Sequence, residues 1–238
     1  MAGRFVAVRD HLRQLGGVNG SLYLLNRGLE RISRGWLRLV KYDLMVQPVP
    51  DEPLLPAHRG RNIQVHEAGR DDPVLAQAMG RPPETLQARF DAGARCLVAE
   101  IDGEFAGFLW FIQGDYDEDE VRCTFRPEPL GASVWDFDVL VAPQHRLSPV
   151  FLKLWQVAGI LLREEGVAYA CSRISAFNPR SRAAHVRLGA QRAGVALFLC
   201  AGICQLEIVT RPTRCTMKCD GKRKSVIRVG RCTPSDSD

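Results

Sequence analysis

Hydrophobic and polar residues follow two different periods along this chain, and each period predicts a different kind of element. Apolar and polar residues alternate in residues 36–46 (WLRLVKYDLMV) and 133–141 (SVWDFDVLV), which is typical of half-buried strands. In residues 148–165 the apolar side chains recur at helical spacing, which predicts a helix with one inward face. The residues of that face are Phe151, Leu154, Trp155, Ala158 and Leu162.

Turn and cap signals divide the rest of the chain. An Asp-Gly pair at 102–103 stands between two apolar runs and predicts a β-hairpin. Ser-Pro at 148–149 and Asn-Pro at 178–179 each join an N-cap residue to a proline and predict helix starts, and Gly189 predicts the end of the second helix. With the remaining elements, the order is β-α-α-β-β-β-α-β-α-β-β. This order favours a mixed α/β sheet over a doubly wound parallel one.

The two ends of the chain differ from its middle. Residues 1–60 predict a helix from about Ser21, a strand and a proline-rich linker (QPVPDEPLLP), which together form an N-terminal extension. Residues 61–210 form the predicted main domain. Beyond Arg211 the hydrophobic period stops, so residues 211–238 predict a basic tail without regular structure.

Charge is segregated along the sequence, although the net charge is only +5. Residues 1–50 contain eight Lys and Arg against three acidic residues, and residues 210–238 repeat this excess. A nucleic acid or an anionic membrane could bind such ends, but no base-stacking or groove-reading motif is present. We therefore expect no nucleic-acid partner and at most peripheral membrane contact through the basic N-terminal helix. The acidic run of residues 115–120 (DYDEDE) predicts a solvated loop.

Cysteine usage and the absence of a leader pattern predict a cytoplasmic protein. The longest apolar run, Val195 to Cys204, is far shorter than the roughly 20 residues of a spanning helix. The eight cysteines are then expected to be reduced thiols. Two CxxxC pairs, Cys200/Cys204 and Cys215/Cys219, suggest a zinc site as an alternative, but no histidine lies near them in the sequence, and we expect no metal.

Two sequence blocks resemble the GNAT N-acetyltransferase superfamily. Asn178-x-x-Ser181-x-x-x-His185-x-x-Leu-Gly-Ala is similar to the family's Asn-x-x-Ala/Ser…Tyr-x-x-x-Gly-Phe signature, with His185 in place of tyrosine and Ala190 in place of phenylalanine. Residues 139–146 (VLVAPQHR) resemble the V-x-P-x-x-R that ends the family's fourth strand. The resemblance covers residues 62–210 and implies a GNAT-like, mostly antiparallel central sheet flanked by helices.

The same resemblance implies an acyl-CoA co-substrate, such as acetyl-CoA. Pantetheine would lie against the strand edge and the helix cap, and the pyrophosphate would lie on the loop that follows the strand. Leu147, Ser148 and Pro149 replace the family's Gly-x-Gly, so fewer amides and less backbone freedom are available for phosphate than in the family. The implied donor-binding residues are Val139, Leu140, Val141, His145, Arg146, Leu147, Ser148, Val150, Asn178 and Ser181.

Catalytic candidates follow from the same resemblance and from the pattern of residues 133–141. His185 occupies the position of the tyrosine that protonates the leaving thiolate, and Ser181 lies one helical turn earlier, where it could orient the imidazole. A packing role for His185 remains open. Asp136 and Asp138 alternate away from Trp135 and Phe137 and are candidates for the general base; function or a nearby arginine must compensate a carboxylate inside a sheet.

Three functions remain open at this stage. The first is an N-acyltransferase that moves an acyl group directly from acyl-CoA to a small amine. The second uses an acyl-carrier-protein thioester as the donor, because the phosphate loop is degenerate and the N-terminus is basic. The third is a catalytically inactive GNAT fold that acts as a binding or scaffold module.

Overall fold

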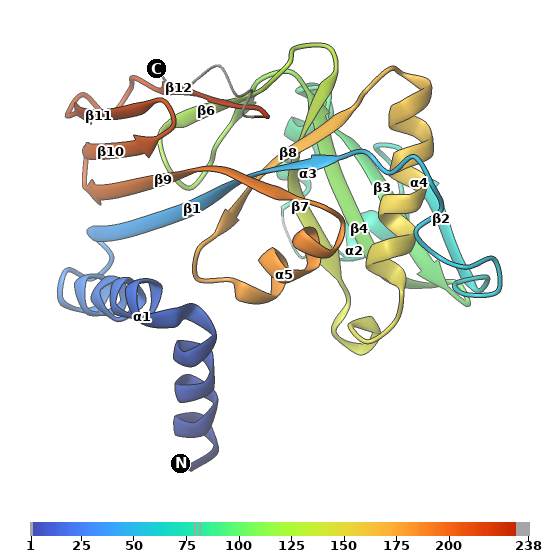
Figure 1. Cartoon of the computed structure of the whole chain (residues 1–238), viewed down its shortest axis with the longest axis horizontal. Coiled ribbons are helices and arrows are strands. Elements are labelled where there is room, and N and C mark those ends of the chain that lie inside the picture. The colour runs from blue at the N-terminus through green and yellow to red at the C-terminus, as the bar shows by residue number, and fades with distance from the viewer. Residues whose placement is uncertain (1, 79, 81, 232–238) are drawn as a thin grey trace. The chain divides into compact units, whose positions relative to one another are not determined.

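A computed structural model describes residues 2–78, 80 and 82–231 of the chain (Figure 1). The helices and strands are α1 (Ala2–Ile32), β1 (Leu37–Pro48), β2 (Ile63–Glu67), α2 (Pro73–Ala78), α3 (Pro83–Asp91), β3 (Arg95–Ile101), β4 (Glu104–Gln113), β5 (Tyr116–Asp117), β6 (Cys123–Pro127), β7 (Ser133–Val141), the 3₁₀ helix η1 (Pro143–His145), α4 (Val150–Glu164), β8 (Tyr169–Ser175), α5 (Pro179–Arg187), β9 (Gln191–Ala201), β10 (Cys204–Thr210), β11 (Thr213–Lys218) and β12 (Ser225–Val229).

The chain divides into two compact units. Unit 1 comprises the described residues of Met1–Gln47, Asp117–Arg126 and Ser172–Asp238, and unit 2 comprises those of Pro48–Tyr116 and Pro127–Cys171. The strand order is β11-β10-β9-β1 in unit 1 and β7-β4-β3-β2 in unit 2, with antiparallel pairing along both runs. The predicted mixed, mostly antiparallel sheet flanked by helices is thereby confirmed.

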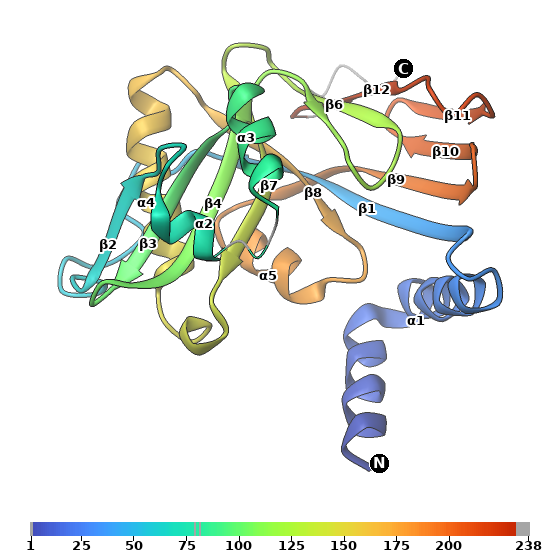
Figure 2. The same ribbon diagram turned by 180° about the vertical axis from the view of Figure 1, so that it is seen from behind.

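In unit 2, helices cover both faces of the sheet. Helix α4 lies in front of β4 in Figure 1, and α2 and α3 lie in front of it in Figure 2, which is turned by 180°. The hairpin between β3 and β4 turns at Asp102 (φ 54°) and Gly103 (φ 79°), the positive φ pair of a tight primed turn. The Asp-Gly pair therefore gives the hairpin that the sequence predicts.

Helix α4 packs against the strands of unit 2 through the apolar face that the sequence predicts, except that one predicted residue is replaced by its neighbour. Leu154, Trp155, Ala158 and Leu162 are buried, but Phe151 is only half-buried and Val150 is buried instead. Close contact with β4 requires Gly107, where an added Cβ would lie 2.5 Å from a β7 carbonyl oxygen and 3.1 Å from the Val150 side chain. Gly107 thus lets β7 and the start of α4 approach the same point of β4.

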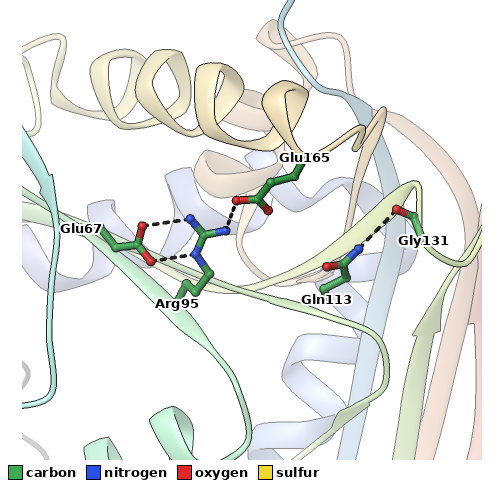
Figure 3. A network of polar contacts seen from close by, with 5 residues as sticks. All are labelled: Glu67, Arg95, Gln113, Gly131 and Glu165. Carbon is green, nitrogen blue, oxygen red and sulfur yellow. Dashed lines mark hydrogen bonds and ion pairs between the residues drawn. The ribbon is translucent and has the colours of Figure 1, made fainter.

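An ion-pair network links the end of α4 to two strands (Figure 3). The Arg95 guanidinium on β3 donates to both carboxylate oxygens of Glu67 on β2 (2.7 and 2.9 Å) and to Glu165 after α4 (2.6 Å). These side chains are partly exposed, so each pair contributes at most about 1 kcal/mol. The side-chain amide of Gln113 donates separately to the carbonyl of Gly131.

In unit 1, a second sheet with the order β12-β6-β5 accompanies the strands β1 and β9–β11. Strand β1 pairs with β9 along almost its whole length, from Leu37 opposite Ala201 to Val46 opposite Gln191. The buried Tyr42 ring lies edge-on to Phe125 on β6 and to Phe198 on β9, with centroid distances of 6.3 and 6.0 Å. These rings form an aromatic core shared by both sheets.

The prediction of a tail without regular structure is wrong for two segments beyond Arg211. Strand β11 pairs with β10 from Gln205 opposite Lys218 to Thr210 opposite Thr213, and β12 joins β6. The guanidinium of Arg214 donates to the buried Glu207 carboxylate (2.9 Å). Basic residues here bind acidic partners of the same unit, so their charge is not a sign of a solvated tail. Residues 232–238 lie outside the described part.

The acidic run at 115–120 is only partly the predicted solvated loop: Asp115, Asp117, Asp119 and Glu120 are exposed, but the run also contains a short strand and a buried carboxylate. Tyr116 and Asp117 form β5, and the Glu118 carboxylate is fully buried. Arg173 on β8 donates to both of its oxygens, at 2.7 and 2.9 Å. Tyr42 donates a short hydrogen bond to Glu120, and burial raises the pKa of this phenol well above its ordinary value.

Helix α1 is longer than predicted and is interrupted. It spans Ala2–Ile32 with a non-helical residue at Gly16 (φ 75°, ψ 174°), and the sharp bend is visible in Figure 1. A glycine accepts this positive φ without steric cost. Among the helices of the described residues, none is both long and apolar enough to cross a membrane.

Candidate functional site

The predicted donor-binding strand, β7, contains a bulge that changes which side chains share a face. Trp110 on β4 lies opposite Asp138 and Phe111 lies opposite Asp136, so the register shifts and Phe137 is the extra residue. A bulge interrupts strict alternation because two residues of one strand oppose one residue of the other. The expected separation of Phe137 from Asp138 is therefore wrong: Arg89 contacts both.

Arg89 on α3 is the arginine that the carboxylate of Asp138 requires. Its guanidinium donates to Asp138 at 2.9 Å and lies 5.1 and 5.0 Å from the ring centroids of Trp110 and Phe137. Both charged side chains are mostly buried. Asp136 is fully buried. Sequence reasoning left open whether function or a nearby arginine compensates these carboxylates, and it had no signal for Arg89, which lies 49 residues from Asp138.

After β7, the chain forms a short turn that leads into α4. The last four residues of β7, from Asp138 to Val141, are half-buried, and the Ala142 amide donates to Ala106 on β4. The turn η1 follows, and α4 begins at Val150, one residue later than the Ser-Pro signal suggests. Ser148 donates its hydroxyl to the carbonyl of His145 at 2.7 Å. This bond closes the loop.

The loop presents one arginine and one histidine near the N-terminus of α4. Arg146 is exposed and has no ion-pair partner among residues 2–78, 80 and 82–231, and Leu147 is fully exposed. The Nε2 atom of His145 is buried and makes no hydrogen bond within the same part of the chain. The first-turn amides of a helix have no carbonyl acceptors within the helix, and the helix dipole adds positive potential there. The positive potential favours an anion here, although the Val150 amide already donates to the Ser148 hydroxyl oxygen at 3.4 Å.

The second group of predicted site residues lies in unit 1, on α5. The Asn178 side chain accepts a hydrogen bond from the Ser181 amide at 3.1 Å, so the predicted N-cap is confirmed. The C-terminal end also follows the sequence: Gly189 has φ 86°, the left-handed conformation of a C′ glycine. The cap accounts for Asn178 structurally, without a ligand.

His185 is held inside unit 1 by the backbone of its own helix. It is 3% exposed, and its Nδ1 atom lies 2.9 Å from the carbonyl oxygen of Ser181. A carbonyl only accepts, so Nδ1 carries the proton and Nε2 is the basic nitrogen of the neutral ring. The bond that holds the imidazole comes from the main-chain carbonyl of Ser181, so the proposed role of Ser181 in orienting His185 for catalysis stays a prediction.

A buried ion pair fixes α5 to β1 and was not foreseen from the sequence. Arg182 lies one turn before His185 and donates to the Asp43 carboxylate at 3.0 Å, and Arg192 lies 3.5 Å from the other oxygen. The Asp43 side chain is almost completely buried. The one available signal was an aspartate inside the apolar alternation of residues 36–46.

One contact joins the thiols of the two CxxxC motifs. Cys219 is hydrogen-bonded to Cys204 from the other motif, and this bond raises the pKa of the Cys219 thiol. Burial raises the pKa of Cys200. Across the described ranges, no group of three or more His, Cys, Asp or Glu side chains is arranged to bind a metal ion. Cys232 lies outside those ranges.

The sequence matches no family model and no curated protein. Solved structures similar to this chain include a functionally unknown conserved protein from Staphylococcus epidermidis ATCC 12228, at 12% identity and a TM-score of 0.49 over 72% of this chain and 65% of that chain. A tandem GNAT protein from the clavulanic acid biosynthesis pathway is 16% identical, with a TM-score of 0.45 over 65% of this chain and 50% of that chain.

A third similar structure is the ribosomal-protein-alanine N-acetyltransferase from Brucella melitensis biovar Abortus 2308, at 20% identity and a TM-score of 0.32 over 44% of this chain and 74% of that chain. The first two matches span less than two thirds of the proteins they match. GNAT acetyltransferases are therefore among the structural neighbours, but at these scores no activity follows from them.

Proposed function

We propose that this chain is an N-acyltransferase of the GNAT type, which transfers an acyl group from acyl-CoA to an amine in a ternary complex. The main support is the strand–turn–helix segment from β7 to α4. This segment presents Arg146 beside a helix N-terminus, where its side chain is exposed and has no ion-pair partner among the described residues. A pyrophosphate needs this combination of positive potential and amide donors. One of the two GNAT-like sequence blocks lies on the segment from β7 to α4, and the other lies on α5.

Coenzyme A in this proposal is a co-substrate that supplies the acyl thioester. Arg146 pairs with its phosphates, with His145 beside it in the loop, and the half-buried end of β7, Val139 to Val141, offers its edge to pantetheine. Two features reduce the affinity of the loop for phosphate. Pro149 has no amide hydrogen, and the fully exposed Leu147 stands where the family has glycine.

His185 is the proposed proton donor to the leaving thiolate. The amine attacks the thioester carbonyl, the C–S bond breaks, and the thiolate takes a proton. Because Nδ1 is bound to a carbonyl, only the doubly protonated ring can donate from Nε2, whereas the neutral ring accepts a proton there. His185 can therefore remove the amine proton in one step and return it to sulfur in the next.

The carboxylates of β7 have separate proposed roles. The Arg89 guanidinium donates to the Asp138 carboxylate at 2.9 Å, and this contact favours a role for Asp138 in fixing α3 to β7. Asp136 remains the second candidate for the base. An Asp138→Asn variant separates these roles, since a structural residue changes the melting temperature and leaves kcat of the folded enzyme unchanged.

Donor binding is the first test. We expect acetyl-CoA to bind the purified chain in native mass spectrometry, and release of free coenzyme A on addition of an amine panel, measured by liquid chromatography. Arg146→Ala should raise the donor KM at least tenfold, equivalent to about 1.4 kcal/mol. Arg163→Ala is the matched control, because Arg163 is exposed at the opposite end of α4. An unchanged donor KM for Arg146→Ala would exclude Arg146 from the site.

Turnover is the second test. His185→Phe should lower kcat by roughly 10²–10⁴-fold while the donor still binds, and His185→Tyr should retain part of the activity. Wild-type-like rates in both variants would assign His185 to packing alone. Turnover with an acyl-carrier-protein thioester but not with acyl-CoA would identify the carrier as the donor. Binding without any turnover would favour the scaffold function.

A further inference from the structure

The second arm of α1, residues 17–32, contacts the rest of unit 1 through two asparagine side chains and one tyrosine ring. The side-chain oxygen of Asn19 accepts from Lys41 Nζ at 2.7 Å, and that of Asn26 accepts from the Leu39 amide at 2.7 Å. One turn after Asn19, the Tyr23 ring packs edge-on against Phe177, with centroids 5.6 Å apart. A surface helix normally uses apolar side chains for such contacts.

The opposite side of the same arm is apolar and faces outward. Val18, Leu25 and Ile32 follow one another at seven-residue intervals, which places them on one helical face, and they are 72%, 51% and 86% exposed. Leu24 adds to this face, and Trp36, just beyond the helix, is 68% exposed. We call these five residues the outer α1 face. Several large apolar side chains exposed along one helix and just beyond it indicate an interaction site more often than single exposed ones do.

Cationic residues accompany the outer α1 face. Arg27, Arg31 and Arg34 are exposed, and none of the three has an ion-pair partner within residues 2–78, 80 and 82–231, although the Arg27 guanidinium donates to the Tyr23 hydroxyl at 3.2 Å. The one acidic residue between Val18 and Trp36 is Glu30, and it already accepts a hydrogen bond from Asn26 at 3.0 Å. An apolar stripe with positive charge beside it is the composition of a helix that lies in the plane of an anionic membrane surface.

We propose that the outer α1 face binds the surface of an anionic lipid bilayer. The aliphatic side chains enter the boundary between headgroups and acyl chains, Trp36 lies at the interface, and the three guanidinium groups contact lipid phosphates. The polar contacts of Asn19, Tyr23 and Asn26 keep the arm fixed on unit 1, so binding needs no rearrangement of the helix. The proposal is independent of the acyltransferase activity.

Charge distinguishes a bilayer from a second copy of the chain. Two copies joined through this face would bring their arginines together, and the stretch from Val18 to Trp36 offers only Glu30 to compensate them. The large residues of the helical part of the face are all aliphatic, and the small residues Ser21 and Gly28 lie between them. In a protein–protein interface, by contrast, a few central residues, often aromatic, contribute most of the binding free energy. A fluid lipid surface needs no shape complementarity.

The tryptophan content provides a direct readout in the full-length protein. Trp110, Trp135 and Trp155 are buried and Trp36 is exposed, so a change in emission on adding vesicles reports on Trp36. We expect a blue shift and co-sedimentation with phosphatidylcholine vesicles that contain phosphatidylserine, and neither with pure phosphatidylcholine. Added salt should weaken binding, because screening reduces the attraction between arginine and phosphate.

Variants assign the binding to this face. Leu25→Glu/Ile32→Glu should reduce vesicle affinity at least tenfold, and Arg31→Glu/Arg34→Glu should abolish the preference for anionic lipid. The control is Met217→Glu, an equally exposed apolar position on β11, which should bind as wild type does. All these positions are on the surface, and unchanged circular dichroism confirms folding. No binding by wild type, or equal binding to both vesicle types, would overturn the proposal. A third result would also overturn it: the wild-type protein is a dimer that does not bind vesicles, and Ile32→Glu converts it to a monomer. That result would assign the face to a second copy of the chain.

Discussion

The pair of Glu118 and Arg173 allows a quantitative test of how unit 1 is stabilised. The Glu118 side chain has no solvent exposure, and the Arg173 side chain is 21% exposed. Arg173 also lies over the Tyr42 ring, with its guanidinium carbon 5.1 Å from the centroid. Replacing Arg173 with Met keeps a long side chain on that ring but leaves the Glu118 carboxylate buried without this counter-ion.

Breaking a buried ion pair on one side costs about 3–5 kcal/mol of folding free energy. We expect Arg173→Met to lose this amount at neutral pH, a large share of the stability of a typical domain. Part of the loss should disappear at lower pH, since Glu118 can then take up a proton and become neutral. The size of the loss must therefore change with pH.

The direction follows from the pKa of Glu118. Burial already raises this pKa above its ordinary value of 4.5, and Arg173 partly offsets the rise. A carboxyl group with a raised pKa stabilises the fold below its unfolded pKa, and this contribution is lost as pH rises through the folded pKa. Without Arg173 the folded pKa rises further. The penalty should then grow by about 1.4 kcal/mol per pH unit between the wild-type and variant pKa values.

Urea denaturation of wild type and Arg173→Met at several pH values between 5 and 8 measures this difference. The companion variant Arg173→Met/Glu118→Gln removes the charge and should recover most of the stability at pH 8. A penalty that is equal at all pH values, or no recovery in the double variant, would show that packing and not charge is responsible.

Three further predictions concern other elements. Gly107→Ala should destabilise unit 2 by about 1–3 kcal/mol in urea denaturation, because its Cβ would lie 2.5 Å from the Leu140 carbonyl oxygen; an unchanged midpoint would contradict the close contact. Asn178→Ala should cost about 1 kcal/mol through loss of the α5 cap, and Asn178→Asp should cost much less. Iodoacetamide should label the exposed Cys215 in the native protein but not Cys171, whose pKa burial raises to about 12; mass spectrometry distinguishes them.

The sequence predicts correctly those turns and helix ends that depend only on neighbouring residues. The primed turn between β3 and β4 and the cap and end of α5 depend on neighbouring residues, and the sequence shows them directly. The apolar face of α4 follows from spacing alone and differs only at Val150. These features are predictable because the physical interaction and the pattern occupy the same few residues.

The remaining features depend on partners far away in the sequence. Glu118 resembles any residue of an acidic loop, and only Arg173, 55 residues later, makes it part of a core. Arg214 resembles a residue of a basic tail until Glu207 and β10 are placed beside it. Asp138 and Arg89 meet because of a bulge that no local pattern marks. The candidate site was therefore predictable in its loop and in α5, but not in the ion pairs around it.

The pairing of β1 with β9 also has a consequence for biosynthesis. Strand β1 leaves the ribosome early, and β9 begins about 140 residues after β1 ends. At a synthesis rate of about 5–20 residues per second, β1 waits roughly 7–30 s for this partner. During that time an apolar strand exposes unpaired backbone groups, the state in which nascent chains aggregate. Chaperone dependence during translation should therefore be greatest in the interval before β9 emerges.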